Sequence, residues 1–433
     1  MLDRGVAPET GDFGDISLPF PKHKRLSNGV GLLVMDCASE DVVRIDLVFD
    51  GGLFEQEKPM LFRLMLSMLK QGTKGFDASY IAGQLDFCGA WLQTGTYDHH
   101  TVITVYSIHR CLDKVLEIIE QMIKYPVFPE HEFNVLKKQV ISELRNNRQR
   151  VKYLATRGFN KSFFGKDHPL GRVNTISSLK ELKRGDLKDL HDRYMTQHNC
   201  RIMLTGKINA ETVSLVDKYF GKEWTTGDNV VKLNRTPASP SDVRLSVINK
   251  TDSLQSCVVM GIPAVERSHE DYIPLRILVI ALGGYFGSRL MSNIREEKGY
   301  TYGISASLIG RADSSYIMIS SESDTKYTWL LIDEVKKEID KLKEFEIEEE
   351  ELEIVKSNIL SDLVKTSDSL FSIAEFHITA ICCGIPDDYF KKHIELIKNI
   401  TPEKLKQMAQ KYFVQEKLFI SVAGDKNKLK KLC

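Results

Sequence analysis

An internal repeat constrains the fold of this chain more than any other feature of its sequence. The segment DLKDLHDRYMTQHNCRIMLTG at 186–206 aligns with KLKQMAQKYFVQEKLFISVAG at 404–424, at an offset of 218 residues. A second pair of segments, 132–144 and 351–363, aligns at an offset of 219 and sets Glu143 opposite Asp362. Two blocks at nearly one offset predict that the chain is two copies of one structural unit.

Each copy mixes the period-2 alternation of strands with the 3.6-residue periodicity of helices, which predicts two α+β domains in tandem. We place the first domain at 1–221 and the second at 243–433. The segment between them, 222–242, is rich in turn formers and has no apolar periodicity, so we expect a linker there.

Composition excludes two classes of protein. The 433 residues are 42% apolar and can bury large cores, while 59 basic residues balance 59 acidic ones. A net charge near zero argues against a nucleic-acid binder and against a polybasic membrane anchor. The longest apolar run, 275–282, is interrupted by Arg276 and is far shorter than the roughly 20 residues of a membrane span. We therefore expect neither a nucleic-acid nor a membrane partner.

The cysteines and the N-terminal residues indicate a compartment. Eight cysteines are scattered without C-x-x-C spacing, which favours reduced thiols over a disulfide framework or a structural zinc site. The first 15 residues contain no apolar core of a signal peptide. Both observations predict a cytoplasmic protein.

A nearly all-apolar helix is predicted over 59–71, PMLFRLMLSMLKQ. Its first residue, Pro59, suits a first helical turn, and Gly72 suits a stop. The polar exceptions Arg63, Ser67 and Lys70 recur at i, i+4 and i+7 and form one stripe on an otherwise buried helix. On its own, such a stripe indicates only a face toward solvent or a crevice.

The stretch 283–303, GGYFGSRLMSNIREEKGYTYG, predicts a short helix that Gly299 ends, followed by a strand over 302–308. Arg295 then lies in the last turn of the helix and Tyr302 at the start of the strand, close enough to act as a pair. Taken alone, they are a surface arginine and a half-buried tyrosine.

The string IREEKGYTYG resembles the R-E-K-x-G-x-x-Y motif in the second domain of the pitrilysin, insulinase and mitochondrial processing peptidase family, the inverted-motif zinc peptidases. The resemblance covers nearly the whole chain, from about residue 28 to 422. It implies that each domain is a mostly antiparallel sheet packed against helices. It also implies that Arg295 and Tyr302 act on the substrate.

The zinc motif of that family is degenerate here. Aligned on Gly72 and the following threonine, the H-x-x-E-H positions fall on 63–67, where Arg63, Leu66 and Ser67 replace the histidines and the glutamate. Arginine does not release a proton to ligate a cation, leucine accepts no proton, and a serine hydroxyl is a poor zinc ligand. Neither H-x-x-E-H nor H-E-x-x-H occurs elsewhere, so we predict no metal site in this chain.

Glu143 lies 76 positions after Ser67, where the resemblance places the distal glutamate ligand of the family. We hypothesise that Arg63 and Glu143 form an ion pair in place of the metal, because a guanidinium matches the geometry of a carboxylate. The alternative is an exposed helical glutamate without a special partner.

The resemblance implies a function divided between two chains, since working members of the family need four such domains. We expect this chain to be the non-catalytic, substrate-positioning subunit of a heterodimeric zinc peptidase that processes or degrades peptides. Its partner would be a homologous subunit with an intact H-x-x-E-H and the zinc ion. We predict that this chain alone is inactive and binds no cofactor of its own.

Two alternatives stay open. The chain could be a catalytically silent scaffold, like the family's core subunits in a respiratory complex, or a peptide-binding homodimer. A hydrolase with a different nucleophile is the other alternative, although the sequence contains no G-x-S-x-G and no Cys/His arrangement with matching spacing.

Overall fold

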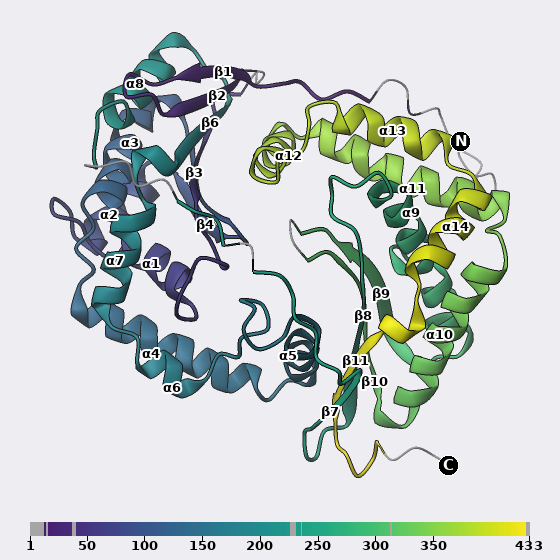
Figure 1. The fold of residues 1–433 in the computed structure, drawn as a ribbon. Coiled ribbons are helices and arrows are strands. Elements are labelled where there is room, and N and C mark those ends of the chain that lie inside the picture. The colour runs from purple at the N-terminus through teal and green to yellow at the C-terminus, as the bar shows by residue number, and fades with distance from the viewer. Residues whose placement is uncertain are drawn as a thin grey trace, which may run out of the picture.

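The computed structural model describes residues 13, 16–36, 40–225, 231–234, 236–311 and 314–429. The described strands form two sheets, one in each half of the chain (Figure 1). The first sheet has the order β1-β2-β6-β3-β5-β4 and the second has the order β7-β11-β8-β10-β9. The strands of the first sheet are β1 (Lys22–Arg25), β2 (Gly31–Asp36), β3 (Val43–Asp50), β4 (Trp91–Thr96), β5 (His100–Ser107) and β6 (Cys200–Gly206). The strands of the second sheet are β7 (Leu245–Asn249), β8 (Gln255–Pro263), β9 (Thr301–Ile309), β10 (Tyr316–Asp324) and β11 (Phe419–Gly424).

Apart from β1, the two sheets have the same topology. The pair β2–β6 is parallel, as is its counterpart β7–β11, and the other neighbouring strands are antiparallel. Strands β4 and β9 are the corresponding edge strands. The predicted fold class is therefore confirmed: two homologous α+β domains in tandem, each with a mostly antiparallel sheet packed against helices.

The helices that connect the strands follow the same order in both halves of the chain. Those of the first half are α1 (Leu61–Leu69), α2 (Ala78–Phe87), α3 (His109–Lys124), α4 (Glu130–Asn147), α5 (Val151–Phe164), α6 (Ile176–Lys180), α7 (Arg184–Tyr194) and α8 (Ala210–Phe220). Those of the second half are α9 (Tyr272–Gly283), the π-helix η2 (Met291–Glu297), α10 (Thr328–Glu344), α11 (Glu349–Asp368), α12 (Leu370–Cys382), α13 (Tyr389–Asn399) and α14 (Pro402–Tyr412). Single 3₁₀ turns are η1 (Gln197–Asn199), η3 (Thr325–Tyr327) and η4 (Gln415–Lys417).

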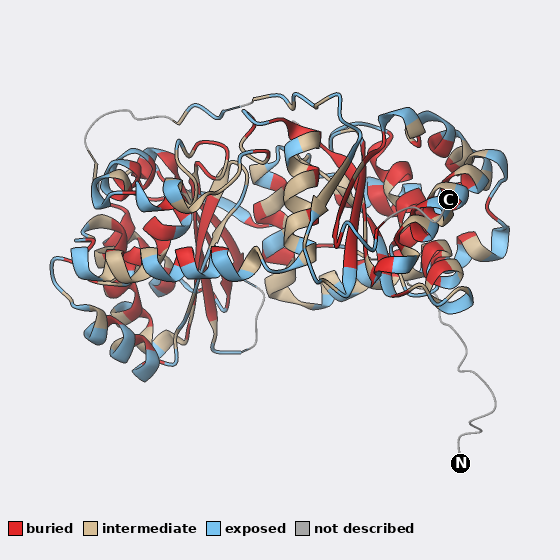
Figure 2. Cartoon of the chain, turned by 90° about the horizontal axis from the view of Figure 1, so that it is seen from below, coloured by how far each residue is buried: buried red, intermediate tan, exposed pale blue. Residues whose placement is uncertain are grey.

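Each sheet is covered on one face by a helix from the other half of the chain. Helix α5 packs on β8 and β11 of the second sheet, where Phe159 and Phe163 are buried with Phe419. Helix α12 contacts β6 of the first sheet, and Ile378 joins the buried cluster that contains Met203. Buried residues consequently run along the strands of both sheets (Figure 2). This exchange ties the halves together, because separating them would expose two apolar faces.

A buried polar cluster joins α12 to the first sheet. On β3, the guanidinium of Arg44 donates to both carboxylate oxygens of Asp46, at 2.8 and 3.0 Å. Thr104 on β5 donates to the same carboxylate at 2.7 Å. The remaining nitrogen of Arg44 donates to the carbonyl of Phe371 at 3.0 Å and to Glu375 at 3.2 Å, both on α12. Burial raises the pKa of Asp46 against the opposing effect of Arg44, so this carboxylate depends on its partners to stay ionised.

Two histidines are held in the neutral form by their surroundings. Burial lowers the pKa of His393 on α13 to about 3, and the charge of Arg276 lowers it further in the same direction. The guanidinium of Arg276 lies 3.4 Å from Nε2 of His393, so this nitrogen accepts rather than donates. His100 on β5 has its pKa lowered to about 4, by burial first and then by the charge of Arg201.

Acid should therefore destabilise the protein well above the range in which carboxylates titrate. Below the ordinary histidine pKa of about 6.5, the unfolded chain binds a proton at each of these sites and the folded chain does not. We expect the free energy of unfolding to fall by up to about 1.4 kcal/mol per pH unit for each histidine, levelling off near its folded pKa. Urea unfolding between pH 7 and 4 measures the slope. His393→Gln should reduce this slope, because it removes one of the two titrating groups.

Candidate functional site

Helix α1 presents the degenerate zinc-motif positions on two different faces. Arg63 and Ser67 lie one turn apart on the exposed stripe, whereas Leu66 is buried in the core. The helix begins at Leu61 rather than at Pro59 as predicted, because Met60 takes a left-handed conformation with φ of 68°. The shorter helix still contains the whole motif, so the predicted register of the stripe is retained.

The hypothesised pair between α1 and α4 is present in the structure. Arg63 Nη2 donates to Glu143 Oε2 at 2.7 Å, and Nη1 donates to Oε1 at 3.2 Å. Ser67 uses its hydroxyl locally, donating to the carbonyl of Arg63 at 2.9 Å. The two side chains of the pair are 51% and 45% exposed, so solvent screens the interaction and its net contribution to stability is at most about 1 kcal/mol.

This constellation does not fit a zinc ion. A catalytic zinc site needs three protein ligands, usually including imidazoles, and here a guanidinium engages both carboxylate oxygens of Glu143. Within the described ranges, no group of three or more His, Cys, Asp or Glu side chains is arranged to hold a metal. The chemistry at this position is a charge pair between two helices.

Restoring the ligands should create a zinc site if α1 and α4 hold the zinc-site geometry. In the double variant Arg63→His/Ser67→His, two imidazoles one helical turn apart would face Glu143 once its arginine partner is removed. We expect about one zinc ion per chain after dialysis, measured by elemental analysis, against none for the unmodified protein. Adding Glu143→Gln should weaken retention, and zinc that stays bound regardless of residue 143 would refute the proposed geometry.

The stretch 283–303 forms a compact turn between α9 and the edge strand β9. The predicted helix is present but is wound as the π-helix η2, and backbone bonds from Lys298 to Asn293 and from Tyr300 to Ile294 close its end. Gly299 takes a φ of 64°, which suits glycine because it has no Cβ to clash. Strand β9 then starts at Thr301, so the tight turn sets the spacing between the helix and the strand.

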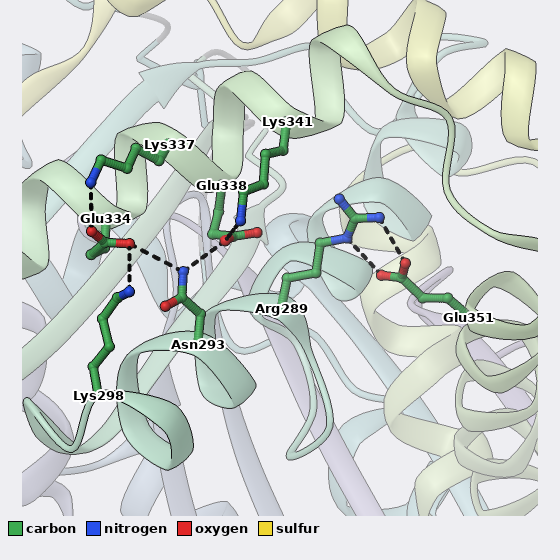
Figure 3. Close-up of polar contacts among 8 residues, drawn as sticks. All are labelled: Arg289, Asn293, Lys298, Glu334, Lys337, Glu338, Lys341 and Glu351. Carbon is green, nitrogen blue, oxygen red and sulfur yellow. Dashed lines mark hydrogen bonds and ion pairs between the residues drawn. The ribbon is translucent and has the colours of Figure 1, made fainter.

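Polar contacts to α10 and α11 anchor this turn (Figure 3). Arg289 donates twice to Glu351, at 2.8 and 2.7 Å. Asn293 donates to Glu338 at 2.7 Å and to Glu334 at 3.3 Å. Arg289 and Asn293 therefore hold the turn against two long helices.

Glu334 is the centre of this network. Besides the hydrogen bond from Asn293, its carboxylate binds the ammonium of Lys337 at 2.8 Å and that of Lys298 at 3.3 Å. Partial burial acts to raise the pKa of Glu334, but the hydrogen bonds from Lys337, Asn293 and Lys298 outweigh it and lower the pKa below its ordinary value. The carboxylate therefore stays ionised and continues to bind both lysines.

Arg295 and Tyr302 differ from these neighbours because the fold does not use their polar groups. Tyr302, on β9, is 92% exposed rather than half-buried. The guanidinium of Arg295 lies over the ring of Phe286, with Cζ 4.6 Å from the ring centroid. Across the described residues, neither side chain makes a hydrogen bond or an ion pair, with the other or with any third residue. Within the described fold, the hydrogen-bond donors of both side chains are thus free.

Sequence reasoning did not single out Phe286. It lies in the loop between α9 and η2, outside any periodic pattern, and an aromatic residue nine positions before an arginine is no recognisable motif. Its exposed fraction of 62% is the structural signal that the ring is not a core residue.

Comparison with known proteins identifies the relatives of this chain. Residues 181–359 match the family model described as the peptidase M16 inactive domain. A "non-peptidase homolog YmxG" of Helicobacter pylori is 22% identical over 397 residues, covering 89% of each chain. An "uncharacterized zinc protease" of Rickettsia felis is 25% identical over 398 residues, covering 90% of this chain and 94% of its own length.

Solved structures share the fold. A peptidase M16 inactive domain from Pseudomonas fluorescens superposes with a TM-score of 0.84 at 20% identity, over 94% of this chain and 98% of that one. A protease from Helicobacter pylori gives a TM-score of 0.84 at 18% identity, over 94% of this chain and all of its own. Among the helices that the structure describes, none is both long enough and apolar enough to cross a membrane.

Proposed function

We propose that this chain, whose residues 181–359 match the peptidase M16 inactive domain and whose sequence resembles the inverted-motif zinc peptidases, is the non-catalytic, substrate-positioning subunit of a heterodimeric zinc peptidase. A homologous partner with an intact H-x-x-E-H would supply the zinc ion and the general base. This chain would supply Arg295 and Tyr302 to the bound peptide.

The free donors of Arg295 and Tyr302 are the observation that carries this proposal. A guanidinium and a phenol that make no hydrogen bond within the described fold do little for its stability, and both project from an anchored turn. Peptide hydrolysis develops negative charge on the carbonyl oxygen, and preorganised donors stabilise that charge. This chain has such donors, but its α1 has an ion pair at the zinc-motif positions. This combination favours an active site in which a second chain supplies the metal.

A catalytically silent scaffold or a peptide-binding homodimer is the second candidate. It is favoured by the name of the Helicobacter pylori relative, a non-peptidase homologue, and by the Arg63–Glu143 pair. It gives no reason for Arg295 and Tyr302 to make no hydrogen bond or ion pair within the described residues. We also propose a cytoplasmic location, which suits the six described cysteines, all of them free thiols.

The decisive experiment is affinity purification of the tagged chain from a lysate of its own source, followed by zinc analysis and a peptidase assay of the eluate. We expect a partner of similar length with an intact H-x-x-E-H, stoichiometric zinc and hydrolysis of unstructured peptides. A metal-free homodimer, or a large assembly without hydrolysis, would reject the divided peptidase and favour the second candidate.

A further inference from the structure

The three cations of the stretch 289–298 are held in two different ways. Arg289 is bound by Glu351 and Lys298 by Glu334, so carboxylates occupy their N–H donors. Arg295 lies over the ring of Phe286 and has no carboxylate partner in the part of the chain that the structure describes. Within the described residues, the ring of Phe286 is thus the interaction partner that the structure shows for this guanidinium.

The type of restraint matters for what the guanidinium can do. A ring attracts a cation through its negative face, and a guanidinium that lies over this face keeps its N–H donors available around its edge. A carboxylate in the same place would restrain the side chain equally well, but it would neutralise the charge and occupy two donors. An aromatic partner therefore restrains Arg295 without neutralising its charge.

The exposure of Phe286 is explained better by contact with the guanidinium of Arg295 than by packing in the core. Its ring is 62% exposed, whereas the neighbouring Tyr285 packs partly buried against the main hydrophobic cluster of the second domain. An exposed ring of this size contributes little to the core. It lies between Gly284 and Gly287 in the loop that leads into η2, so the backbone fixes its position relative to the helix that carries Arg295.

We propose that Phe286 is a positioning residue for substrate binding: its ring holds the guanidinium of Arg295 in place, with the N–H donors free to bind an oxygen of the peptide, either a backbone carbonyl or a carboxylate. This inference rests on the proposed function only for the identity of the ligand. The restraint of Arg295 by the ring is a property of this chain alone.

The restraint can be tested on the full chain without a partner. In ¹⁵N relaxation measurements of the arginine Nε–Hε groups, Phe286→Ala should increase the mobility of Arg295 and remove the ring-current shift of its signal. Phe286→Trp should preserve both, because it keeps an aromatic face. An unchanged Arg295 signal in Phe286→Ala would overturn the proposal. The signal of Arg289, held by Glu351, is the internal control and should not change.

The functional consequence is tested in the purified complex with a quenched fluorescent peptide. Phe286→Ala should lower kcat/KM by about two- to fivefold, the range of a cation–π contact at an exposed site. Phe286→Trp should restore it. In an Arg295→Ala background, Phe286→Ala should have no further effect, because the ring then has no guanidinium to hold.

The outcomes separate the two proposals. If Arg295→Ala leaves hydrolysis unchanged, the proposed function fails, and the relaxation experiment alone decides the restraint. If Arg295→Ala slows hydrolysis and Phe286→Ala does not, the positioning role of Phe286 is rejected and the proposed function stands. Equal, additive losses from the two substitutions would also reject it, since the residues would then act independently.

Discussion

The Tyr302→Phe variant is expected to lower the turnover of the complex on the order of 100-fold while leaving the complex assembled. The substitution removes a single hydroxyl that makes no hydrogen bond within the described residues, on a side chain that is 92% exposed. Its loss should therefore affect neither the fold nor the association with a partner. It would affect only the transition state, in which a donor binds the developing oxyanion.

Three measurements check this expectation: kcat and KM with a quenched peptide, sedimentation of the complex, and thermal unfolding of the chain. The loss should lie mainly in kcat, because an interaction made in the transition state is removed. Tyr125→Phe is a suitable control, since it deletes another exposed phenol, at the end of α3 in the other half of the chain. Unchanged turnover in Tyr302→Phe would contradict the role assigned to this residue.

Spacing patterns predicted the two related α+β units, and the family resemblance implied the antiparallel sheets and the candidate-site residues. The repeat predicted two related units, and their matching strand orders confirm it. The Arg63–Glu143 pair was predicted because the family resemblance placed both residues at zinc-ligand positions, and the structure contains the pair. An error of two residues at the start of α1 did not matter, because it left the register of the stripe unchanged.

The exchange of α5 and α12 could not be predicted in the same way. Periodicity shows that the helix with Phe159 and Phe163 has an apolar face, but it does not show which of two similar sheets that face covers. The choice depends on the path of the chain after each helix, which no local pattern encodes. The contact between Arg295 and Phe286 escaped prediction for a related reason, since it depends on the shape of a loop and on the π winding of η2.

Removing the buried carboxylate beside α12 is expected to have the largest effect on stability. The Asp46→Ala variant leaves the guanidinium of Arg44 buried, 3% exposed, without the partner that binds it through two hydrogen bonds. We expect the free energy of unfolding to fall by about 3–5 kcal/mol, as in other proteins that lose one member of a buried ion pair. The Asp362→Ala variant provides the contrast, because its pair with Lys365 is exposed on both sides and is worth at most about 1 kcal/mol.

A double variant separates two contributions to the free energy of unfolding: the penalty for a buried, unpaired Arg44 and the stabilisation that the ion pair provides. In Arg44→Met/Asp46→Leu, neither charge of this pair is left, so most of the stability lost in Asp46→Ala should return. The contacts of Arg44 with Phe371 and Glu375 are still absent, however, and they join α12 to β3. Hydrogen exchange should therefore show faster opening of α12 in the double variant even where urea unfolding shows near-normal stability. If α12 exchanges at the original rate, its docking depends on the apolar contacts around Ile378 and Met203 and not on the buried arginine.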